Sequence, residues 1–242
     1  MIKPPIGESP GKRDHVEAMF DAIAPRYDLL NRLLSFGIDV WWRKRAVALL
    51  ADGLAEPPAL LLDMATGTAD LAVEALSLDP RQVIGVDISE GMLAYGRDKL
   101  AARQLDHRIA LVQGDAADLP FEDDLFDGAL VAFGVRNFEN LHDGLAEMRR
   151  VLRPGAPLVV LETSQPTAFP FKQGYDVYAQ HVMPRVGRTV SGNAEAYEYL
   201  PESAREFAHG EAFLRALRAA GYSETLARPL TFGVVSLYRG AA

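Results

Sequence analysis

The stretch that decides the fold is LLLDMATGTAD, residues 60–70. A short apolar run opens into a loop of small residues, and apolar residues at helical spacing follow from Leu71. This pattern predicts a buried strand, a tight turn and the N-terminus of a helix. Such a turn brings backbone N–H groups and the positive end of a helix close to a ligand. The stretch therefore indicates a ligand-binding βα unit.

A second apolar run, VIGVD at residues 83–87, follows about one βα unit later and ends in a carboxylate. An acidic residue at the end of the second strand suits the two ribose hydroxyls of a nucleoside, because one carboxylate can accept from both. The two runs together predict a nucleoside-cofactor site, with Asp87 on the ribose, in a Rossmann-like domain.

The loop composition separates two classes of cofactor. A dinucleotide fingerprint requires three glycines that let the backbone touch a pyrophosphate, whereas this loop has only Gly67, and Asp70 would repel a pyrophosphate. Asp63 and Asp70 instead suit the sulfonium and α-amino group of S-adenosylmethionine. The plain alternative is an ordinary βα turn in which the backbone satisfies a buried Asp63.

Composition excludes several classes of protein. The chain has 242 residues, of which 49% are hydrophobic and 24% charged, as in a soluble globular protein. A net charge of -8 argues against a nucleic-acid partner. No cysteine occurs and the five histidines lack the spacing of metal ligands, so we expect no metal site. Residues 1–11 do not resemble a signal peptide and no run is long enough to span a membrane, so we expect a cytoplasmic protein.

The order of elements predicts an α/β fold. After a flexible N-terminus at residues 1–11, residues 12–53 form a helical lid in which Asp28 and Asp39 can cap helices. Five strand-like runs alternate with helices within a cofactor-binding core at 59–164, which indicates a mostly parallel sheet with helices on both faces. An insertion on the substrate side (166–202) and a C-terminal helix and hairpin (203–242) complete a single domain over 12–242. The five predicted core strands are 59–65, 82–88, 108–114, 126–133 and 156–163, and the two final strands are 223–229 and 232–239.

This seven-stranded pattern resembles that of the class I methyltransferases, and several motifs narrow the resemblance. They are YDLLNRLLSFG at 27–37, WR at 42–43, FGVRN at 133–137, RVLRPG at 150–155, LETSQP at 161–166 and LPESA at 200–204. In this order they resemble the demethylmenaquinone and ubiquinone-biosynthesis C-methyltransferases over nearly the whole chain, with the menaquinone type favoured.

The resemblance implies cofactor ligands at Thr68, Asp87, Asp115 and Ala116. The chemistry of the third strand agrees, because a carboxylate after it can accept from the exocyclic amine of adenine. One departure concerns Asp39, which stands where the family usually has a histidine.

The candidate catalytic residues are Arg136, Asn137 and Tyr27. Arg136 and Asn137 follow the fourth strand, at the sheet edge where doubly wound folds bind ligands. An arginine there can stabilise a ring oxyanion, and Asn137 can orient the ring or a water. Alternatively, Arg136 pairs with Asp127 or Glu139. Tyr27 either closes over the methionine part of the cofactor or packs in a capped helix turn.

The apolar residues between Leu29 and Trp42 precede the basic triplet at 43–45. They either pack in the core or form a surface for a polyprenyl tail or a membrane interface. A homodimer is also left open.

The sequence as a whole favours an S-adenosylmethionine-dependent C-methyltransferase that converts demethylmenaquinol to menaquinol, the last step of menaquinone biosynthesis. The substrate rests on the resemblance. The alternatives are the same chemistry on a benzoquinol precursor of ubiquinone, a nicotinamide oxidoreductase, which the loop disfavours, and a non-catalytic binding module.

Overall fold

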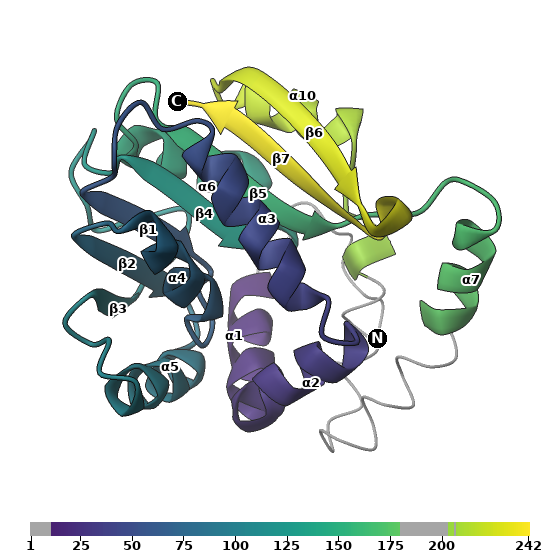
Figure 1. Ribbon diagram of the computed structural model, residues 1–242, viewed down its shortest axis with the longest axis horizontal. Coiled ribbons are helices and arrows are strands. Elements are labelled where there is room, and N and C mark those ends of the chain that lie inside the picture. The colour runs from purple at the N-terminus through teal and green to yellow at the C-terminus, as the bar shows by residue number, and fades with distance from the viewer. Residues whose placement is uncertain (1–10, 180–202, 206) are drawn as a thin grey trace.

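A computed structural model describes residues 11–179, 203–205 and 207–242. Its centre is one seven-stranded sheet in the order β3-β2-β1-β4-β5-β7-β6 (Figure 1). The strands are β1 (Leu60–Met64), β2 (Gln82–Asp87), β3 (Ile109–Gln113), β4 (Gly128–Ala132), β5 (Pro157–Thr163), β6 (Ser223–Leu230) and β7 (Val235–Ala241). The first five are parallel, and β7 runs antiparallel to both of its neighbours. The predicted parallel half with a C-terminal hairpin is therefore confirmed.

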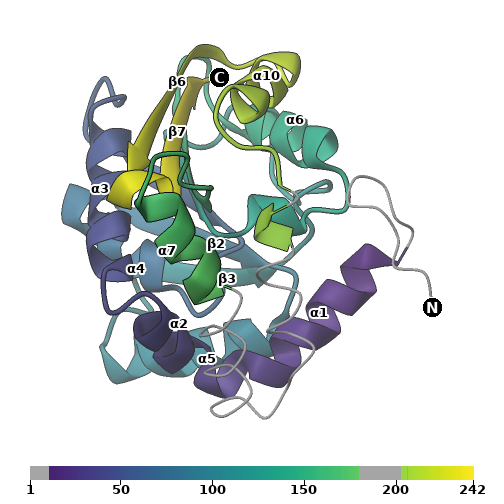
Figure 2. The same ribbon diagram turned by 90° about the vertical axis from the view of Figure 1, so that its right-hand side faces the viewer.

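Helices cover both faces of the sheet. The α-helices are α1 (Lys12–Ile23), α2 (Tyr27–Leu34), α3 (Asp39–Ala51), α4 (Asp70–Ala75), α5 (Glu90–Ala102), α6 (Leu141–Val151), α7 (Phe171–Val177) and α10 (Glu211–Ala219). Short 3-10 turns are η1 (Ala24–Arg26), η2 (Leu76–Leu78), η3 (Val135–Asn137) and η5 (Thr231–Gly233). In Figure 2, α3 and α4 lie on one side of the strands and α6 and α10 on the other. This layering follows from the alternation of strands and helices in the sequence.

Two apolar cores hold these layers together. Alternate residues of the central strands point to opposite faces, so Leu61, Leu130 and Val159 pack with α3 and α4, whereas Leu62 and Val160 pack with α6 and α10. All five are at most 1% exposed. The strands buried on both faces read as continuous apolar runs, as parallel sheets require.

Three local predictions were wrong. The last strand begins at Val235 rather than 232, because residues 231–233 form η5, where Phe232 has a φ of 56°. Asp39 is the first residue of α3 and does not cap it, since the N-cap is Ile38. Asp28 lies inside α2, whose N-cap is Arg26, and its carboxylate accepts from Thr68 instead.

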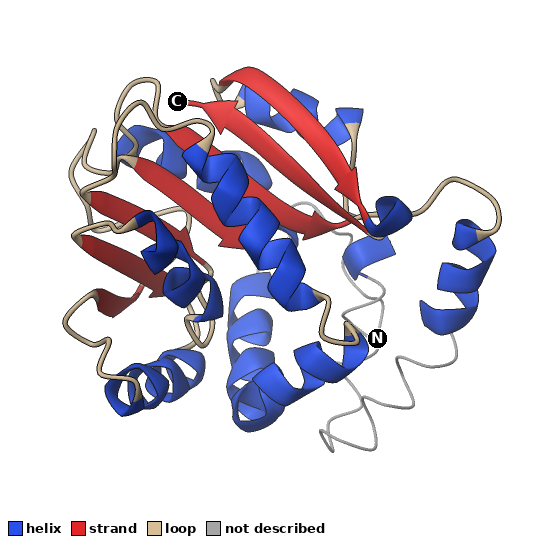
Figure 3. Ribbon diagram, viewed as in Figure 1, coloured by secondary structure: helices blue, strands red, loops and turns tan. Residues whose placement is uncertain are grey.

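The strand order reverses between β1 and β4, which lie next to each other although β2 and β3 separate them in the chain. In doubly wound folds this point, at the carboxyl ends of the strands, forms the ligand crevice. Figure 3 shows α1 and α2 as a pair of helices beneath the sheet, with α7 standing apart from it. Within the described residues, no helix combines the length and the apolar character needed to cross a bilayer.

The division into lid, core and insertion stays a prediction. Most of the insertion predicted at 166–202, and most of the motif at 200–204, lies outside the described residues. The described part of the insertion contains α7.

Candidate active site

Two neighbouring cavities lie at the carboxyl edge of the sheet. They contain about 680 Å³ and 910 Å³ of empty space, their open mouths included. Tyr27 and Phe133 line both cavities. We call them the polar cavity and the aromatic cavity, after the side chains described below.

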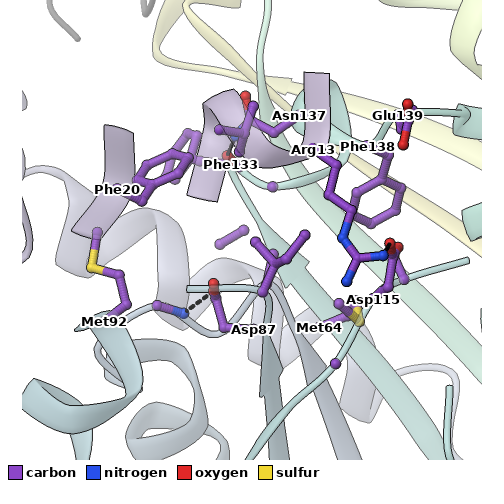
Figure 4. Close-up of a pocket in the computed structure, with 18 of the residues that line it drawn as sticks. Arg13, Phe20, Met64, Asp87, Met92, Asp115, Phe133, Asn137, Phe138 and Glu139 are labelled. Carbon is purple, nitrogen blue, oxygen red and sulfur yellow. Dashed lines mark hydrogen bonds and ion pairs between the residues drawn. The ribbon is translucent and has the colours of Figure 1, made fainter. Parts of the chain in front are cut away.

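The polar cavity lies at the switch point (Figure 4). Loops after β1, β2, β3 and β4 form its floor, and α1 and α2 supply the opposite wall. Its lining includes Arg13, Phe20, Tyr27, Met64, Ala65, Gly67, Asp87, Met92, Asp115, Ala116, Phe133, Gly134, Asn137, Phe138 and Glu139. It thus brings together Gly67, Asp87, Asp115 and Ala116, which the sequence proposed as cofactor ligands.

The loop after β1 has a left-handed residue at every second position. Ala65, Gly67 and Ala69 have φ values of 54°, 56° and 70°. Glycine adopts this conformation freely, whereas a non-glycine residue there costs on the order of 1 kcal/mol or more. Two alanines therefore take conformations that glycine usually supplies, and the turn still presents its backbone to the cavity.

Asp87 joins the first two strand ends. Its Oδ2 accepts from the Gly67 N–H at 2.7 Å, drawn as the dashed line in Figure 4, and its Oδ1 accepts from the Ser89 N–H at 2.9 Å. Burial raises the pKa of Asp87 to about 6, although these backbone hydrogen bonds oppose the shift. A carboxylate has about four acceptor positions, so these backbone hydrogen bonds leave part of its capacity for a ribose hydroxyl.

The side chain of Asp63 contacts the loop after β1 rather than the cavity. It is 1% exposed, its Oδ2 accepts from Thr66 Oγ1 at 2.5 Å, and it is not among the described residues that line the polar cavity. Burial raises the pKa of Asp63 to about 7, against the hydrogen bond from Thr66. The geometry therefore supports a part for Asp63 in holding the loop after β1, and its direct contact with a cofactor stays a prediction.

Thr68 and Asp70 face a charged network instead of the cavity. Thr68 Oγ1 donates to Asp28 at 2.5 Å, and Lys99 Nζ donates to Thr68 Oγ1 at 2.9 Å. Asp70 pairs with Lys99 at 2.8 Å and with Arg43 at 3.1 Å. The hydrogen bond and charge of Lys99 lower the pKa of Asp70 against the effect of its burial. The network ties α2 and α3 to the start of α4, and no interaction of Asp70 with a cofactor is needed to explain its charge.

Helix α1 closes the polar cavity. Arg13 Nη1 pairs with Asp115 Oδ2 at 3.2 Å, and Figure 4 shows this guanidinium pointing at Asp115. Lys12 Nζ donates to the backbone oxygens of Arg136 (3.1 Å) and Phe138 (2.7 Å). These contacts hold the helix across the loops after β3 and β4. Asp115 Oδ1 also accepts from Ala117 N–H at 3.0 Å, which fixes the carboxylate at the rim.

The aromatic cavity lies next to the polar one. Its lining is mainly aromatic and apolar and comes from α2, α3, η3, β5, α7 and the last strand: Tyr27, Asn31, Leu34, Ser35, Asp39, Trp42, Arg43, Phe133, Arg136, Thr163, Tyr175, Tyr178, Ala204, Val234 and Val235. A flat aromatic ligand with a non-polar substituent fits this lining best.

Arg136 is the most deeply buried arginine of the aromatic cavity. It is 7% exposed, and its Nη1 pairs with Glu162 Oε1 at 2.5 Å. The pairing with Asp127 or Glu139 considered from the sequence was wrong, since Asp127 pairs with Arg153 instead. Sequence spacing could not reveal Glu162, because β4 and β5 become neighbours only in the sheet.

Tyr27 lies at the junction of the two cavities. A Cβ built on Gly67 would meet its ring at 3.8 Å, so the tyrosine lies against the cofactor loop. Burial raises the pKa of Tyr27, and a hydrogen bond with Asn31 and the charge of Arg136 oppose that shift. Asn137 lines the polar cavity and donates to the Phe133 carbonyl at 3.5 Å. From these positions, Tyr27 and Asn137 can both help to orient bound ligands.

The apolar cluster at 29–42 divides into two sets. Leu30 and Trp42 are buried, and Trp42 Nε1 donates to Thr231 Oγ1 at 2.7 Å. Leu29, Leu33, Phe36, Ile38 and Trp41 are exposed. Phe169, Phe171, Val177 and Phe232 extend the exposed set, which we call the apolar rim. Phe36 contacts Tyr178 of the aromatic cavity at 5.8 Å between ring centroids, so the rim continues its wall.

Sequence reasoning missed several lining residues. Arg13 and Phe20 lie on a helix whose apolar spacing was visible, but the strand loops it covers were not. Tyr175 belongs to a segment without a periodic signal, and burial raises its pKa.

The chain matches the ubiE/COQ5 methyltransferase family over residues 9–242. It is similar to the demethylmenaquinone methyltransferase of Porphyromonas gingivalis, with 47% identity over 95% of this chain and 93% of that one. The demethylmenaquinone methyltransferase of Thermus thermophilus shares 48% identity over 92% and 99% of the two chains. The protein of Geobacter sulfurreducens named ubiquinone/menaquinone biosynthesis C-methyltransferase UbiE shares 43% over 95% and 89%.

Solved structures support the fold. The [4+2]-cyclase SpnF superimposes with a TM-score of 0.67 at 17% identity, covering 99% of this chain and 98% of that one. A SAM-dependent methyltransferase from Aquifex aeolicus gives 0.56 at 17% identity, covering 80% and 87%. Because a cyclase shares the fold, the fold alone does not define the reaction.

Proposed function

Because the chain belongs to the ubiE/COQ5 methyltransferase family, we propose that it transfers a methyl group from S-adenosylmethionine to a ring carbon of a demethylated polyprenyl naphthoquinol. The product is menaquinol, and the reaction is the last step of menaquinone biosynthesis. The substrate is inferred from the similar demethylmenaquinone methyltransferases, which share 43–48% identity with this chain. A nicotinamide oxidoreductase is not consistent with membership of this family.

One observation carries the proposal: two cavities of different chemistry meet at Tyr27 and Phe133. The polar cavity offers carboxylates at the ends of β2 and β3, which suit the ribose and the adenine of the methyl donor. The aromatic cavity offers apolar walls and one buried arginine, which suit a quinol ring and its oxygen. Methyl transfer in line requires donor and acceptor to meet at one point, and this junction supplies it.

The reaction requires electron density on the acceptor. S-adenosylmethionine supplies a methyl group on a sulfonium, which is an electrophile, whereas an oxidised quinone is itself poor in electrons. A quinolate places charge on the carbon ortho to its oxygen. Arg136 stabilises that anion where it develops, in a site from which most water is excluded. The substrate is therefore the reduced form.

The quinone pool of cells with and without the gene tests the substrate. Mass spectrometry should find menaquinone in cells that carry the gene and its demethylated precursor in cells that lack it. The wild-type gene should restore the methylated form, as should a variant with the exposed Arg81→Ala. An unchanged pool after deletion of the gene would refute the assignment.

A benzoquinol precursor of ubiquinone is the second candidate, since the Geobacter sulfurreducens relative carries a name that covers both pathways. The aromatic cavity is lined by large rings on several sides, which favours a two-ring substrate. Competition between a naphthoquinol and a benzoquinol carrying the same short tail decides between them. A higher kcat/KM for the benzoquinol would reverse the choice.

We further propose that the apolar rim binds reversibly to the surface of a membrane. A polyprenyl tail is insoluble in water, and exposed aromatic side chains beside basic residues suit a headgroup interface. Trp41 is 47% exposed, with the Arg45 guanidinium 6.0 Å from its ring, whereas Trp42 is buried and takes no part. The net charge of -8 keeps this association weak.

Flotation with vesicles tests the rim. The Trp41→Ser/Phe36→Ser pair should lower recovery with zwitterionic vesicles relative to wild type, while Tyr95→Ser, an exposed aromatic on α5, should not. Equal recovery of all three proteins would remove the proposal. Light scattering would detect the competing occupant of the rim, a second copy of the chain in a homodimer.

A further inference from the structure

The ion pair between Arg136 and Glu162 is only half satisfied. Glu162 Oε1 takes Arg136 Nη1 at 2.5 Å, the Thr163 N–H at 2.7 Å and Thr163 Oγ1 at 3.1 Å. Among the described residues, the other carboxylate oxygen, Oε2, has no hydrogen-bond partner although it is buried. The same holds for Arg136 Nε. One acceptor and one donor are thus open on the same buried pair.

Buried polar groups without partners are rare and costly, and a buried ion pair with open positions is destabilising unless something fills them. A hydroxyl group satisfies both positions at once, because it accepts from an N–H and donates to a carboxylate. Arg136 and Thr163, the two contacts of Glu162, both line the aromatic cavity. Glu162 itself is 0% exposed and is not among the described residues that line the cavity, so a ring hydroxyl bound there would meet the pair beside Arg136 and Thr163.

The other carboxylate at this cavity is already engaged. Asp39 Oδ1 accepts from Ser35 Oγ at 2.7 Å, and Asp39 Oδ2 pairs with Arg43 Nη1 at 2.9 Å. Tyr27 and Tyr175 are neutral phenols whose pKa is raised by burial, so neither takes up a proton. Among the described lining residues and their direct contacts, Glu162 is the carboxylate with an open oxygen.

We infer that Glu162 accepts the proton of the ring hydroxyl when the quinol reacts. This inference rests on the proposed function. The O–H proton moves to Glu162 Oε2, and Arg136 then pairs with the quinolate. Electron density from the ortho carbon forms the new C–C bond to the methyl group, and the electrons of the broken C–S bond stay on sulfur.

The remaining steps restore the enzyme. The methylated ring carbon loses its hydrogen to water as a proton, the ring regains its aromaticity, and Glu162 returns its proton to the ring oxygen. One proton is released to solvent in each turnover. The buried site holds one positive and one negative charge both before and after the first transfer, so no net charge is created in a region of low dielectric.

In the described part of the chain, two titratable groups interact with Glu162 from neighbouring elements. Arg136 comes from η3, and Tyr238 comes from β7, where burial and the charge of Glu162 raise its pKa. Tyr238 Oη accepts from the Gly210 N–H at 2.8 Å.

The test compares Glu162→Gln with wild type on short-chain naphthoquinols whose hydroxyls are made progressively more acidic by ring substituents. Glutamine keeps an oxygen for Arg136 and Thr163 but cannot take up a proton. General-base catalysis contributes roughly 10²–10⁴-fold, so the variant should lose about that factor in kcat on the parent quinol. The loss should shrink below about tenfold for the most acidic quinol, which ionises without help.

The pH profile provides the second readout. Between pH 7 and 9, the Glu162→Gln rate should rise about tenfold per pH unit, whereas the wild-type and Glu162→Asp rates should stay nearly flat. Asp39→Asn, at the engaged carboxylate, should show the same rate ratio to wild type on every quinol. Binding of S-adenosylmethionine to each variant verifies folding, and Glu162→Asp carries the test if the glutamine variant does not fold.

A constant ratio of wild-type to Glu162→Gln rates over the whole series, with parallel pH profiles, would overturn the inference and leave Glu162 as a support for Arg136. If the wild-type protein methylates no quinol in the series, the proposed function itself fails. The two failures are therefore distinguishable.

Discussion

The polar and aromatic cavities share a wall but are built in different ways. The polar cavity consists largely of loops that follow consecutive strand ends, and its candidate ribose ligand, Asp87, is fixed by the backbone N–H groups of Gly67 and Ser89. The aromatic cavity consists of side chains from several separate elements, and its buried arginine, Arg136, is fixed by the side chain of Glu162.

The difference indicates how each cavity responds to change. The backbone N–H groups that shape the polar cavity remain when a side chain is replaced. A substitution there should therefore alter the affinity for S-adenosylmethionine in a graded way. A side-chain pair fails when either member is lost, because the other is left buried and charged. We therefore expect the larger effects in the aromatic cavity, and chiefly on rate.

The largest effect is expected for Arg136→Ala. Loss of one donor to a developing oxyanion typically lowers the rate about 10²–10³-fold. Binding of S-adenosylmethionine, measured by calorimetry, should change less than about threefold, because Arg136 does not line the polar cavity among the described residues. Arg81→Ala is the control for loss of an arginine at the surface. Wild-type turnover of Arg136→Ala would remove the distinction between the cavities.

Asp87→Ala tests the polar cavity in the same way. Loss of hydrogen bonds to a charged group costs about 1.5–3 kcal/mol, or roughly tenfold to a hundredfold in affinity for S-adenosylmethionine. At saturating donor, most of the rate should return. Calorimetric titration measures the affinity, and an unchanged dissociation constant would contradict the assignment of the ribose site.

Acidification should weaken cofactor binding through the same residue. Burial raises the pKa of Asp87 to about 6 without ligand, and ribose hydroxyls favour its charged form. The dissociation constant should be steady above pH 7 and increase about tenfold per pH unit below 6. The contribution of Asp87 to folding has the opposite sign: it is greatest below the unfolded pKa of about 4 and is lost as pH rises through 6.

Asp87→Asn is the control for this pH dependence, because it has no carboxyl group to titrate. Its dissociation constant should be flat between pH 5 and 7. An equally steep loss of affinity in the variant would assign the titration to another group, with Asp63, whose pKa burial raises to about 7, as the first candidate.

The smallest effect is expected at the rim of the aromatic cavity. Phe36 is 76% exposed, and covering part of its ring with a tail should contribute about 1 kcal/mol. Phe36→Ser should thus raise KM about fivefold for a quinol with a long tail and leave KM for a tail-free quinol unchanged. The same shift for both substrates would place the tail elsewhere.

The polar cavity could be predicted from the sequence because its determinants are local. Each ligand group follows a strand that reads as an apolar run, and parallel strands end at one edge, so Gly67, Asp87 and Asp115 converge without any knowledge of packing. The limits of this reasoning appear at Asp63 and Thr68, whose positions in the loop were predicted but whose side chains turn to Thr66 and Asp28.

The aromatic cavity could not be assembled in this way. Glu162 follows Arg136 by 26 residues, and the two meet only because β4 and β5 are neighbours and η3 follows β4. Which of the two tryptophans is buried depends on the rotation of α3 about its axis. This rotation packs Trp42 against Phe133 and leaves Trp41 exposed to solvent. Periodicity predicts a helix but does not determine which of two adjacent rings faces the sheet.

The central claim is that the two cavities form one site for methyl transfer to a reduced quinol. The direct measurement follows isotopically labelled methyl from S-adenosylmethionine to a short-chain demethylated naphthoquinone, with and without a chemical reductant. We predict one labelled methyl group on the ring carbon ortho to a hydroxyl, and only in the presence of the reductant. Equal rates in both conditions, or label on oxygen, would contradict the account.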